Sequence, residues 1–348
     1  MRVLVTGHHG YIGSITAPLL AEAGHDVVGL DTFFYRGCDF GDDGDPVPFI
    51  AADVRDVTPG QLGDFEAVVH LAALSNDPLG DLNSEWTYEI NLDGTLALAR
   101  AAKEAGVERF VFASSCSMYG AVTSDDLLDE DAPLRPLTPY AESKVRAEEA
   151  LHELADSGFS PVFMRNATAF GASPRLRLDV VLNNLAAWAH TTGRIRLLSD
   201  GSAWRPLVHV QDIARATLAL LEAPRALVHD QSFNVGSANQ NIRISDLANT
   251  LHELLDCDVE MSTDATPDPR SYRVDFGKLG RALPDFRCEW TAELGAEELV
   301  ESYQRVGLSY DEFQETGRYT RLAQLKRLLA EDRIDDGLRW RESDRAVG

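Results

Sequence analysis

A run of glycines follows a short hydrophobic segment at the beginning of the chain: Thr6-Gly7-His8-His9-Gly10-Tyr11-Ile12-Gly13. The preceding segment, Arg2–Thr6, has the Val/Leu pattern of a buried strand, and Tyr11–Ala23 has the pattern of a helix. Glycines at this spacing allow a tight turn and a close approach of the backbone to a phosphate group, which the first helical turn then faces. The chain is therefore constrained to begin with a β–α unit built around a phosphate-bearing ligand. The residues expected at the contact are Gly7, Gly10, Tyr11, Ile12 and Gly13.

An acidic residue follows the second predicted strand. This strand, Asp26–Leu30, ends next to Asp31, about 20 residues beyond the glycine run. A carboxylate at that position hydrogen-bonds the adenosine ribose of a dinucleotide and repels a 2′-phosphate, which favours NAD over NADP. Arg36 is the nearest base and could soften that preference. A glycine run alone also occurs in structural turns, but with Asp31 the pattern predicts an NAD site.

The first half of the chain alternates strand-like and helical segments. Val/Leu/Phe/Ala-rich runs without polar alternation are typical of strands that are buried on both faces of a parallel sheet. We therefore predict an α/β fold, a doubly wound parallel sheet with a smaller C-terminal lobe. The dinucleotide-binding domain is expected over residues 1–170, and residues 171–348 are expected to form mostly a substrate lobe, with some segments returning to the first domain. The further strands are Ala67–Leu71, Arg109–Ser114, Pro161–Met164, Arg205–Val210 and Ser232–Val235, and the further helices are Thr87–Ala105, Tyr140–Ser157, Asp212–Leu221, Ile244–Leu255 and Tyr319–Ala330.

Composition excludes several classes of function. Asp and Glu number 56 and Lys and Arg 32, so the net charge is −24. Such a surface repels nucleic acids and anionic membranes, and any phosphate must be met by local arginines or helix N-termini. Four scattered cysteines without a Cys-x-x-Cys pair, no membrane-length apolar run and no room for a signal peptide predict a cytoplasmic protein. His8 and His9 have no acids or thiols spaced with them, so we expect exposed loop residues and no metal site.

Tyr140 and Lys144 lie four residues apart in Tyr-Ala-Glu-Ser-Lys, and therefore on one face of a helix. An ammonium beside a phenol favours the phenolate, a base that works near neutral pH. Upstream, the strand that ends at Ser114-Ser115 brings hydroxyl groups to the carboxyl edge of the sheet, where ligands bind in such folds. A Tyr-x-x-x-Lys pair alone is common on surface helices, so its neighbours carry the prediction.

The ordered set of motifs resembles the extended branch of the short-chain dehydrogenase/reductase superfamily that acts on nucleotide sugars. The resemblance covers about residues 1–300. It is carried by the glycine run, Asp31, Asp53-Val54, His70-Leu71-Ala72-Ala73, Asn91, Ser114-Ser115, Tyr140 with Lys144, Arg205 within Trp204–Val210, and Phe233-Asn234-Val235-Gly236.

That resemblance implies roles for individual residues. Tyr140 would be the catalytic base, Lys144 would hold the nicotinamide ribose, and Ser115 would be the catalytic hydroxyl. Asp53 would contact the adenine of NAD with Val54 beside it, and the remaining cofactor contacts would be Leu71, Ala72, Ala73, Asn91 and Ser114. The nucleotide diphosphate sugar would be contacted by Ser75, Ser115, Cys116, Ser117, Thr168, Arg175, Arg177, Asn184, Arg205, Asn239 and Arg270.

The reaction depends on the two residues directly after the catalytic hydroxyl. In the family, 4,6-dehydratases carry an acidic pair there, because elimination of water needs a general acid and base. Here these positions are Cys116 and Ser117, which resemble the 4-epimerases. We expect an NAD-dependent epimerase that acts at C4 through a 4-keto sugar. The alternatives are a reductase or 4,6-dehydratase of a nucleotide sugar, and a dinucleotide-sensing protein without catalysis.

Three further points stay open in the sequence. Cys116 matches a cysteine acid/base of some relatives but is shifted by one residue, so a buried structural cysteine is favoured. The family implies a homodimer through the helix of Tyr140 and the helix before it, and the apolar Leu96, Leu98 and Ala99 are compatible with that contact. The residues after about Tyr310 lie outside the resemblance, and no function is assigned to them.

Overall fold

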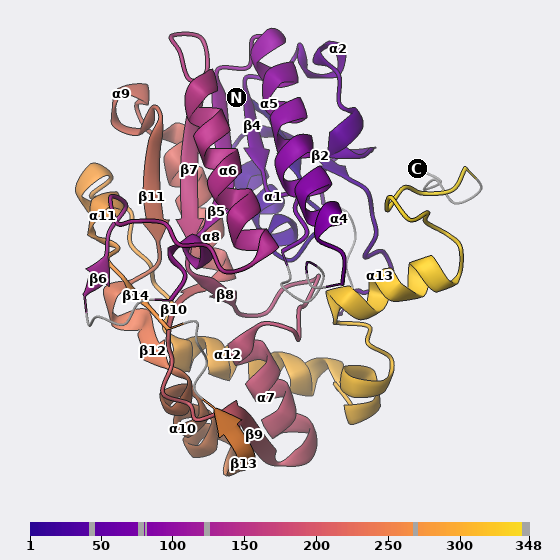
Figure 1. Ribbon diagram of the computed structural model, residues 1–348, viewed down its shortest axis with the longest axis vertical. Helices are drawn as coiled ribbons and strands as arrows, with labels where there is room; N and C mark the ends of the chain where they lie inside the picture. The colour runs from indigo at the N-terminus through magenta and orange to yellow at the C-terminus, as the bar shows by residue number, and fades with distance from the viewer. Residues whose placement is uncertain (42–45, 76–79, 81, 122–125, 267–270, 343–348) are drawn as a thin grey trace.

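The computed structural model describes residues 1–41, 46–75, 80, 82–121, 126–266 and 271–342. A sheet of seven parallel strands forms its centre, in the order β11-β7-β5-β4-β1-β2-β3 (Figure 1). The order reverses between β1 and β4, and the crevice at their carboxyl ends is where such sheets bind ligands. The strands are β1 (Arg2–Thr6), β2 (Asp26–Asp31), β3 (Phe49–Ala51), β4 (Ala67–His70), β5 (Arg109–Ser115), β7 (Ser160–Asn166) and β11 (Gln231–Val235).

Helices cover both faces of this sheet (Figure 1). On one face, Val3 and Val5 of β1 share a core with α1 (Gly13–Glu22) and α8 (Val210–Glu222). On the other face, Leu4 shares a core with α2 (Pro59–Leu62), α5 (Thr95–Glu104) and α6 (Pro139–Leu154). Successive side chains of a strand point to opposite faces, so a strand covered on both sides must be apolar throughout. This explains the unbroken hydrophobic runs of the sequence.

The predicted alternation of strands and helices over residues 1–170 is confirmed, whereas the helices Val181–Thr192 and Ala292–Val306 of the second half were not predicted. The short β3 was missed, because its apolar run is only three residues long. The predicted helix over Thr87–Ala105 is divided into α4 (Ser84–Tyr88), the π-helical turn η2 (Glu89–Gly94) and α5. The extra residue of a π-turn redirects side chains within a helix, and here the turn contains the buried Asn91.

A second group of elements forms the lower lobe in Figure 1. A three-stranded sheet of β8 (Thr168–Phe170), β10 (Trp204–His209) and β12 (Asn241–Arg243) links this lobe to the main sheet. Below it, a second core gathers leucines and aromatic residues from three helices and one strand. These are α7 (Val181–Thr192), α10 (Ile244–Leu255), α12 (Ala292–Val306) and β9 (Arg194–Ser199), and β9 pairs with β13 (Asp258–Thr266). The remaining elements are η1 (Val54–Asp56), η3 (Cys116–Tyr119), β6 (Leu127–Leu128), α9 (Arg225–Val228), η4 (Ala238–Gln240), β14 (Arg273–Val274), α11 (Gly277–Ala282), η5 (Asp311–Glu315) and α13 (Arg321–Ala330).

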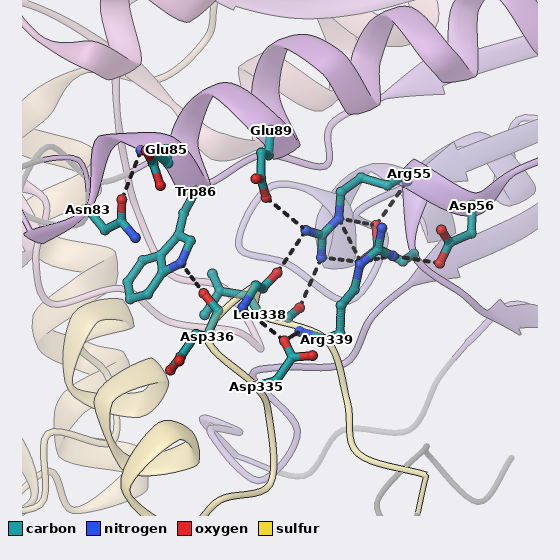
Figure 2. A network of polar contacts seen from close by, with 12 residues as sticks. Arg55, Asp56, Asn83, Glu85, Trp86, Glu89, Asp335, Asp336, Leu338 and Arg339 are labelled. Carbon is teal, nitrogen blue, oxygen red and sulfur yellow. Dashed lines mark hydrogen bonds and ion pairs between the residues drawn. The ribbon is translucent and has the colours of Figure 1, made fainter.

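The C-terminal segment, defined here as residues 320–340, returns to the first domain. Its Leu325, Leu328 and Leu338 pack in one apolar cluster with Phe34 and Leu74, which belong to loops at the carboxyl edge of the sheet. Figure 2 shows the polar contacts that surround this packing. The indole Nε1 of Trp86 donates to the Asp336 carbonyl at 2.6 Å, and the Arg55 guanidinium donates to the carbonyls of Gly337 and Leu338 at 2.8 and 3.0 Å.

The apolar residues of α5 that were considered for a dimer contact lie mostly inside the chain's own core. Leu98 and Ala99 are completely buried, in the core between α5 and the sheet, and Leu96 is only partly exposed. Leu98 and Ala99, which the sequence left compatible with a dimer contact, are therefore not available for one. Their apolar character is explained by packing within one chain.

The helices of the described residues differ from membrane spans, since none of them combines the length and apolar character needed to cross a bilayer. The same part of the chain has no group of three or more His, Cys, Asp or Glu side chains arranged to hold a metal ion.

Replacing Leu338 tests whether the C-terminal segment is packed in solution. Leu338 is fully buried, so L338A removes contacts and leaves a cavity, and we expect the free energy of unfolding to fall by about 2–5 kcal/mol. L227A is the matched control, because Leu227 is 45% exposed and its loss should change the free energy by less than about 1 kcal/mol. Urea denaturation measures both. Equal effects would show that the C-terminal segment is not packed on the domain.

Candidate active site

A cavity of about 290 Å³ opens at the carboxyl edge of the sheet. Its walls come from the residues that follow β1, β2, β3, β4, β5 and β7, with one contribution from the C-terminal segment. The sequence predicted a site at this edge. The predicted residues that line the cavity are Gly7, Gly10, Tyr11, Ile12, Gly13, Asp31, Asp53, Val54, Leu71, Ala72, Ala73, Ser75, Ser114, Ser115, Ser117, Tyr140, Lys144, Thr168 and Arg177.

Close backbone packing shapes the glycine run. Gly7 has a positive φ of 74°, and a Cβ there would lie 2.7 Å from the Ala72 nitrogen. A Cβ on Gly13 would collide with the Gly7 carbonyl oxygen and would lie 2.6 Å from the Cα of His8. Only glycine fits at either position, and the result is a helix α1 whose first turn faces the cavity.

Asp31 is held firmly at the end of β2. Its carboxylate accepts hydrogen bonds from the backbone N–H groups of His9 at 3.1 Å and Phe33 at 2.8 Å. Burial raises the pKa of this carboxyl, while the two N–H groups and nearby cations oppose that shift. The group is thus fixed in orientation and lines the cavity, as binding of a ribose requires.

His8 and His9 differ from the prediction, because both are buried instead of exposed. The ring of His8 packs against Phe33 and Phe49, with centroids 5.5 and 5.8 Å apart. The ring of His9 is in contact with the Arg175 guanidinium, whose Nε lies 3.2 Å from it. Burial and the charge of Arg175 lower the pKa of His9 to about 3, so the ring is neutral at physiological pH. These histidines therefore form the packed base of the loop.

Asp53 lies at the start of η1, where its carboxylate accepts hydrogen bonds from the Arg55 guanidinium at 2.7 to 3.1 Å. Arg339 of the C-terminal segment also lies 3.1 Å from the same carboxylate. Asp53 and Val54 line the cavity, so a contact with the adenine stays a prediction.

The predicted catalytic residues meet where β5 ends beside α6. The Lys144 ammonium donates to the Ala113 carbonyl at 2.7 Å and lies 5.9 Å from the centroid of the Tyr140 ring. Burial, opposed only by Glu148, lowers the pKa of Lys144 to about 7. Ser115 caps η3 by accepting a hydrogen bond from the Ser117 N–H at 3.2 Å. A phenol, an ammonium and a hydroxyl thus surround one part of the cavity.

Unsatisfied polar atoms at this part of the cavity indicate a ligand. Among the described residues, the hydroxyls of Ser114 and Ser117 and the Oδ1 of Asn166 are buried without a hydrogen-bond partner. All three residues line the cavity. Buried polar groups without partners are costly, and groups that converge on one cavity are explained when a ligand completes their hydrogen bonds. Together with the glycine run and Asp31, these residues fit NAD and a polar substrate.

Cys116 is not one of the substrate contacts that the resemblance implied, and its burial agrees with the structural cysteine that the sequence favoured. Its side chain is fully buried and does not line the cavity. The thiol donates to the Arg165 carbonyl at 3.0 Å, and burial raises its pKa well above the ordinary value. A neutral thiol that points into the protein cannot exchange a proton with a substrate, so Cys116 is a structural residue.

Five more predicted residues lie outside the cavity walls. Asn91 is buried and exchanges hydrogen bonds with the backbone of Leu74, at 2.8 and 2.9 Å, so it positions a loop of the cavity. Arg175 holds His9, and its guanidinium pairs with Asp39. The others bond to backbone or side-chain groups near them: Asn184 to Leu178, Arg205 to Trp204 and Asn239 to Ser237. Arg270 lies outside the described residues.

Several lining residues were not predicted, among them Tyr35, Asn166 and Arg321. Arg321, the first residue of α13, lies in the cavity wall beside Tyr35. The helical pattern of this segment was visible in the sequence, but no motif connects Arg321 with Tyr35, which lies 321 − 35 = 286 residues earlier in the chain. Only the folded chain brings the two together.

The sheet order and the cavity define a dinucleotide-binding enzyme of the short-chain dehydrogenase/reductase type. The profile of the NAD dependent epimerase/dehydratase family matches residues 3–236. UDP-glucose 4-epimerase of Bacillus subtilis (strain 168) is 30% identical over 263 residues, which cover 68% of this chain and 77% of that protein. The chain therefore belongs to the NAD-dependent epimerase/dehydratase family, which confirms the resemblance, the fold class and the cofactor.

Solved structures agree with this assignment. MoeE5 in complex with UDP-glucose and NAD is 27% identical, with a TM-score of 0.75, and the match covers 88% of this chain and 100% of that chain. TunA, an NAD dependent-NDP-hexosamine 5,6-dehydratase involved in tunicamycin biosynthesis, is 25% identical with a TM-score of 0.77, and the match covers 87% and 98%. Proteins that catalyse different reactions share this fold, so the reaction of this chain must be argued from its site.

Replacing Gly13 tests the cofactor site. In G13A the new methyl group collides with backbone atoms, and the first turn of α1 must shift. We expect NAD to bind about 10- to 100-fold more weakly, because such overpacking costs about 1–3 kcal/mol. G280A is the control, since Gly280 lies within α11 and a Cβ there meets nothing within 4 Å. Isothermal titration with NAD measures both. Unchanged affinity in G13A would exclude this loop from the site.

The buried ammonium of Lys144 predicts a pH dependence of stability. In the unfolded chain a lysine titrates near pH 10.4, whereas Lys144 titrates at about 7 in the fold. Between these values only the unfolded chain holds the proton, so falling pH favours unfolding until the folded pKa is reached. Wild type should therefore lose about 1–3 kcal/mol relative to K144M between pH 9 and pH 7, measured by urea denaturation of cofactor-free protein. K103M is the control, because Lys103 also donates to a carbonyl, at 2.7 Å, but is partly exposed. If the difference in free energy of unfolding between wild type and K144M does not change with pH, the pKa of Lys144 is not lowered.

Proposed function

We propose that this protein is an NAD-dependent epimerase that inverts C4 of a nucleotide diphosphate sugar through a transient 4-keto sugar. The similarity to UDP-glucose 4-epimerase supports the class of reaction. The single observation that carries the proposal is that none of the described residues places a carboxylate beside the catalytic residues. Among the described cavity-lining residues, the acids are Asp31 and Asp53.

Both acids lie at the end of the sheet that is remote from the catalytic residues, where they cannot assist an elimination. Asp31 ends β2 and Asp53 follows β3, whereas Tyr140 and Ser115 lie beside β5, with β1 and β4 between them. Removal of water from a sugar needs an acid and a base at the carbons that react. Ser117 presents a hydroxyl there, and Cys116 points away. The chain thus has the groups for reversible oxidation of an alcohol and, among its described residues, lacks those for dehydration.

Each catalytic residue has a defined task in this proposal. Tyr140, as phenolate, takes the proton of the C4 hydroxyl and returns it later to the 4-keto oxygen. The Lys144 ammonium stabilises the phenolate, and the hydroxyl of Ser115 orients the sugar oxygen. NAD supplies the acceptor and donor of hydride. The unpaired hydroxyl of Ser117 and Oδ1 of Asn166 are available to either face of a sugar ring that turns over between the two hydride transfers.

The proposal also concerns the bound cofactor, the cellular location and the oligomeric state of the protein. Epimerisation returns the cofactor to its starting state, so the protein should work without added NAD. We also propose that the protein is cytoplasmic, as its cysteine pattern predicts, and that it forms a homodimer, as the family resemblance implies. Since Leu98 and Ala99 are buried, the contact must be made by exposed side chains of α5 and α6.

Incubation in D2O with a panel of UDP-, dTDP-, GDP- and CDP-sugars, without added cofactor, tests the reaction. We expect one sugar to give an isomer of unchanged mass, because the hydride never exchanges with solvent. Y140F should keep bound NAD and lose about 10²–10⁴-fold in rate, since the base is removed. Y88F is the control, because the Tyr88 hydroxyl bonds Glu142 outside the cavity. Chromatography and mass spectrometry identify the products.

Other products would contradict the proposal in distinct ways. Loss of water would establish a dehydratase, and incorporated deuterium would establish chemistry at a carbon acid. Turnover that appears only with added reduced cofactor would establish a reductase. Binding of NAD without any turnover would leave a sensing protein, and full activity in Y140F would remove Tyr140 from the mechanism.

A further inference from the structure

Arg321 is a buried cation without a matching anion among the described residues. Its side chain is 4% exposed, and Cζ lies 4.2 Å from the centroid of the Tyr35 ring. Nη2 donates to the Arg175 carbonyl at 2.7 Å, whereas Nη1 is buried without a hydrogen-bond partner in the described part of the chain. None of the carboxylates described there forms an ion pair with it. The guanidinium therefore retains unused hydrogen-bonding capacity in the cavity wall.

Neighbouring positive charges raise the free-energy cost of burying the Arg321 guanidinium. Arg177 and Arg175 are its cationic neighbours, and their own charges are matched by Asp179 and Asp39. Burial lowers the pKa of Arg321, and the nearby charge of Arg177 lowers it further. An arginine keeps its charge even so, and a buried charge is stable only when an anion compensates it. The structure thus places the Arg321 guanidinium near that of Arg177, which is already paired with Asp179, and leaves Arg321 for a ligand.

The position of Arg321 shows which part of a ligand it meets. Tyr35, on which it stacks, follows Asp31 by four residues, and Arg175, which it bonds, holds His9 inside the glycine run. Arg321 therefore lies beside the two features that surround a dinucleotide between its adenosine ribose and its diphosphate. A helix N-terminus alone supplies only partial positive charge there, and the chain has a net charge of −24.

We propose that Arg321 binds the diphosphate of the dinucleotide cofactor, so that the C-terminal segment is part of the cofactor site. This inference rests on the proposed NAD site but not on the proposed reaction. The planar guanidinium stacked on Tyr35 presents Nη1 to an anion, and a diphosphate is the anion that the glycine run requires. The diphosphate of a nucleotide sugar has the same chemistry, but the neighbouring Asp31 and Tyr35 favour the cofactor.

Titration of cofactor-free protein with ADP and with adenosine tests the inference. ADP carries the diphosphate and adenosine does not, so the ratio of the two affinities isolates the phosphate contact. In R321Q, ADP should bind about 10- to 100-fold more weakly, with adenosine unchanged, because a charged hydrogen bond is lost. R321K should retain part of the preference for ADP. R327Q is the matched control, since Arg327 lies on the same helix and its side chain is 51% exposed.

Each other result overturns the inference. Unchanged ADP binding in R321Q would remove Arg321 from the site, and equal loss of ADP and adenosine would make it a structural residue. Weaker binding of UDP, dTDP, GDP or CDP with unchanged ADP binding would assign the contact to the nucleotide sugar. If wild-type protein binds ADP no more tightly than adenosine, it makes no contact with a diphosphate. None of these titrations uses a sugar, so they are independent of the turnover assay.

Discussion

The contact of two backbones, Gly7 against Ala72, is the constraint on which the site depends. It joins the ends of β1 and β4 at the point where the strand order reverses. The same junction is tied by His70, whose ring nitrogens lie 2.7 Å from the Thr6 hydroxyl and 2.8 Å from the Thr95 hydroxyl. Burial lowers the pKa of His70 to about 3, so this link is neutral at physiological pH. These contacts fix the floor of the cavity. The glycine run and the first turn of α1 therefore both face the cavity.

Charge is distributed unevenly around that floor. The acids that line the cavity follow β2 and β3, whereas Lys144 and the hydroxyl groups lie beside β5. A buried ion pair behind this edge, Arg165 with Glu148 at 2.7 Å, supports the strand and does not enter the cavity. An ammonium whose pKa is near 7 is held poorly unless an anion is near it, and a phenolate is such an anion. The site therefore favours transfer of a hydroxyl proton, which distinguishes it from a site for elimination.

Sequence patterns predicted those features that depend on neighbouring residues. The strand over Arg2–Thr6 and the helix over Ile244–Leu255 have their predicted bounds, because hydrophobic periodicity determines them locally. The glycine run, Asp31, Tyr140 and Lys144 were recognisable for the same reason, since their spacing is part of their chemistry. The errors concern contacts between distant segments. His9 is buried because Arg175 covers it, and Cys116 faces the Arg165 carbonyl, and neither partner is visible from the spacing of residues.

The C-terminal segment shows how such distant contacts can matter for function. Phe34 and Leu74 line the cavity on one side and pack against Leu325 and Leu338 on the other. Any ligand that orders these cavity residues must also favour the docked arrangement of the segment, because the two share the same side chains. By linkage, docking of the segment then strengthens binding of that ligand by the same free energy. A terminal helix that contributes little to the main cores thus acquires a place in the site through the residues that it shares with the cavity.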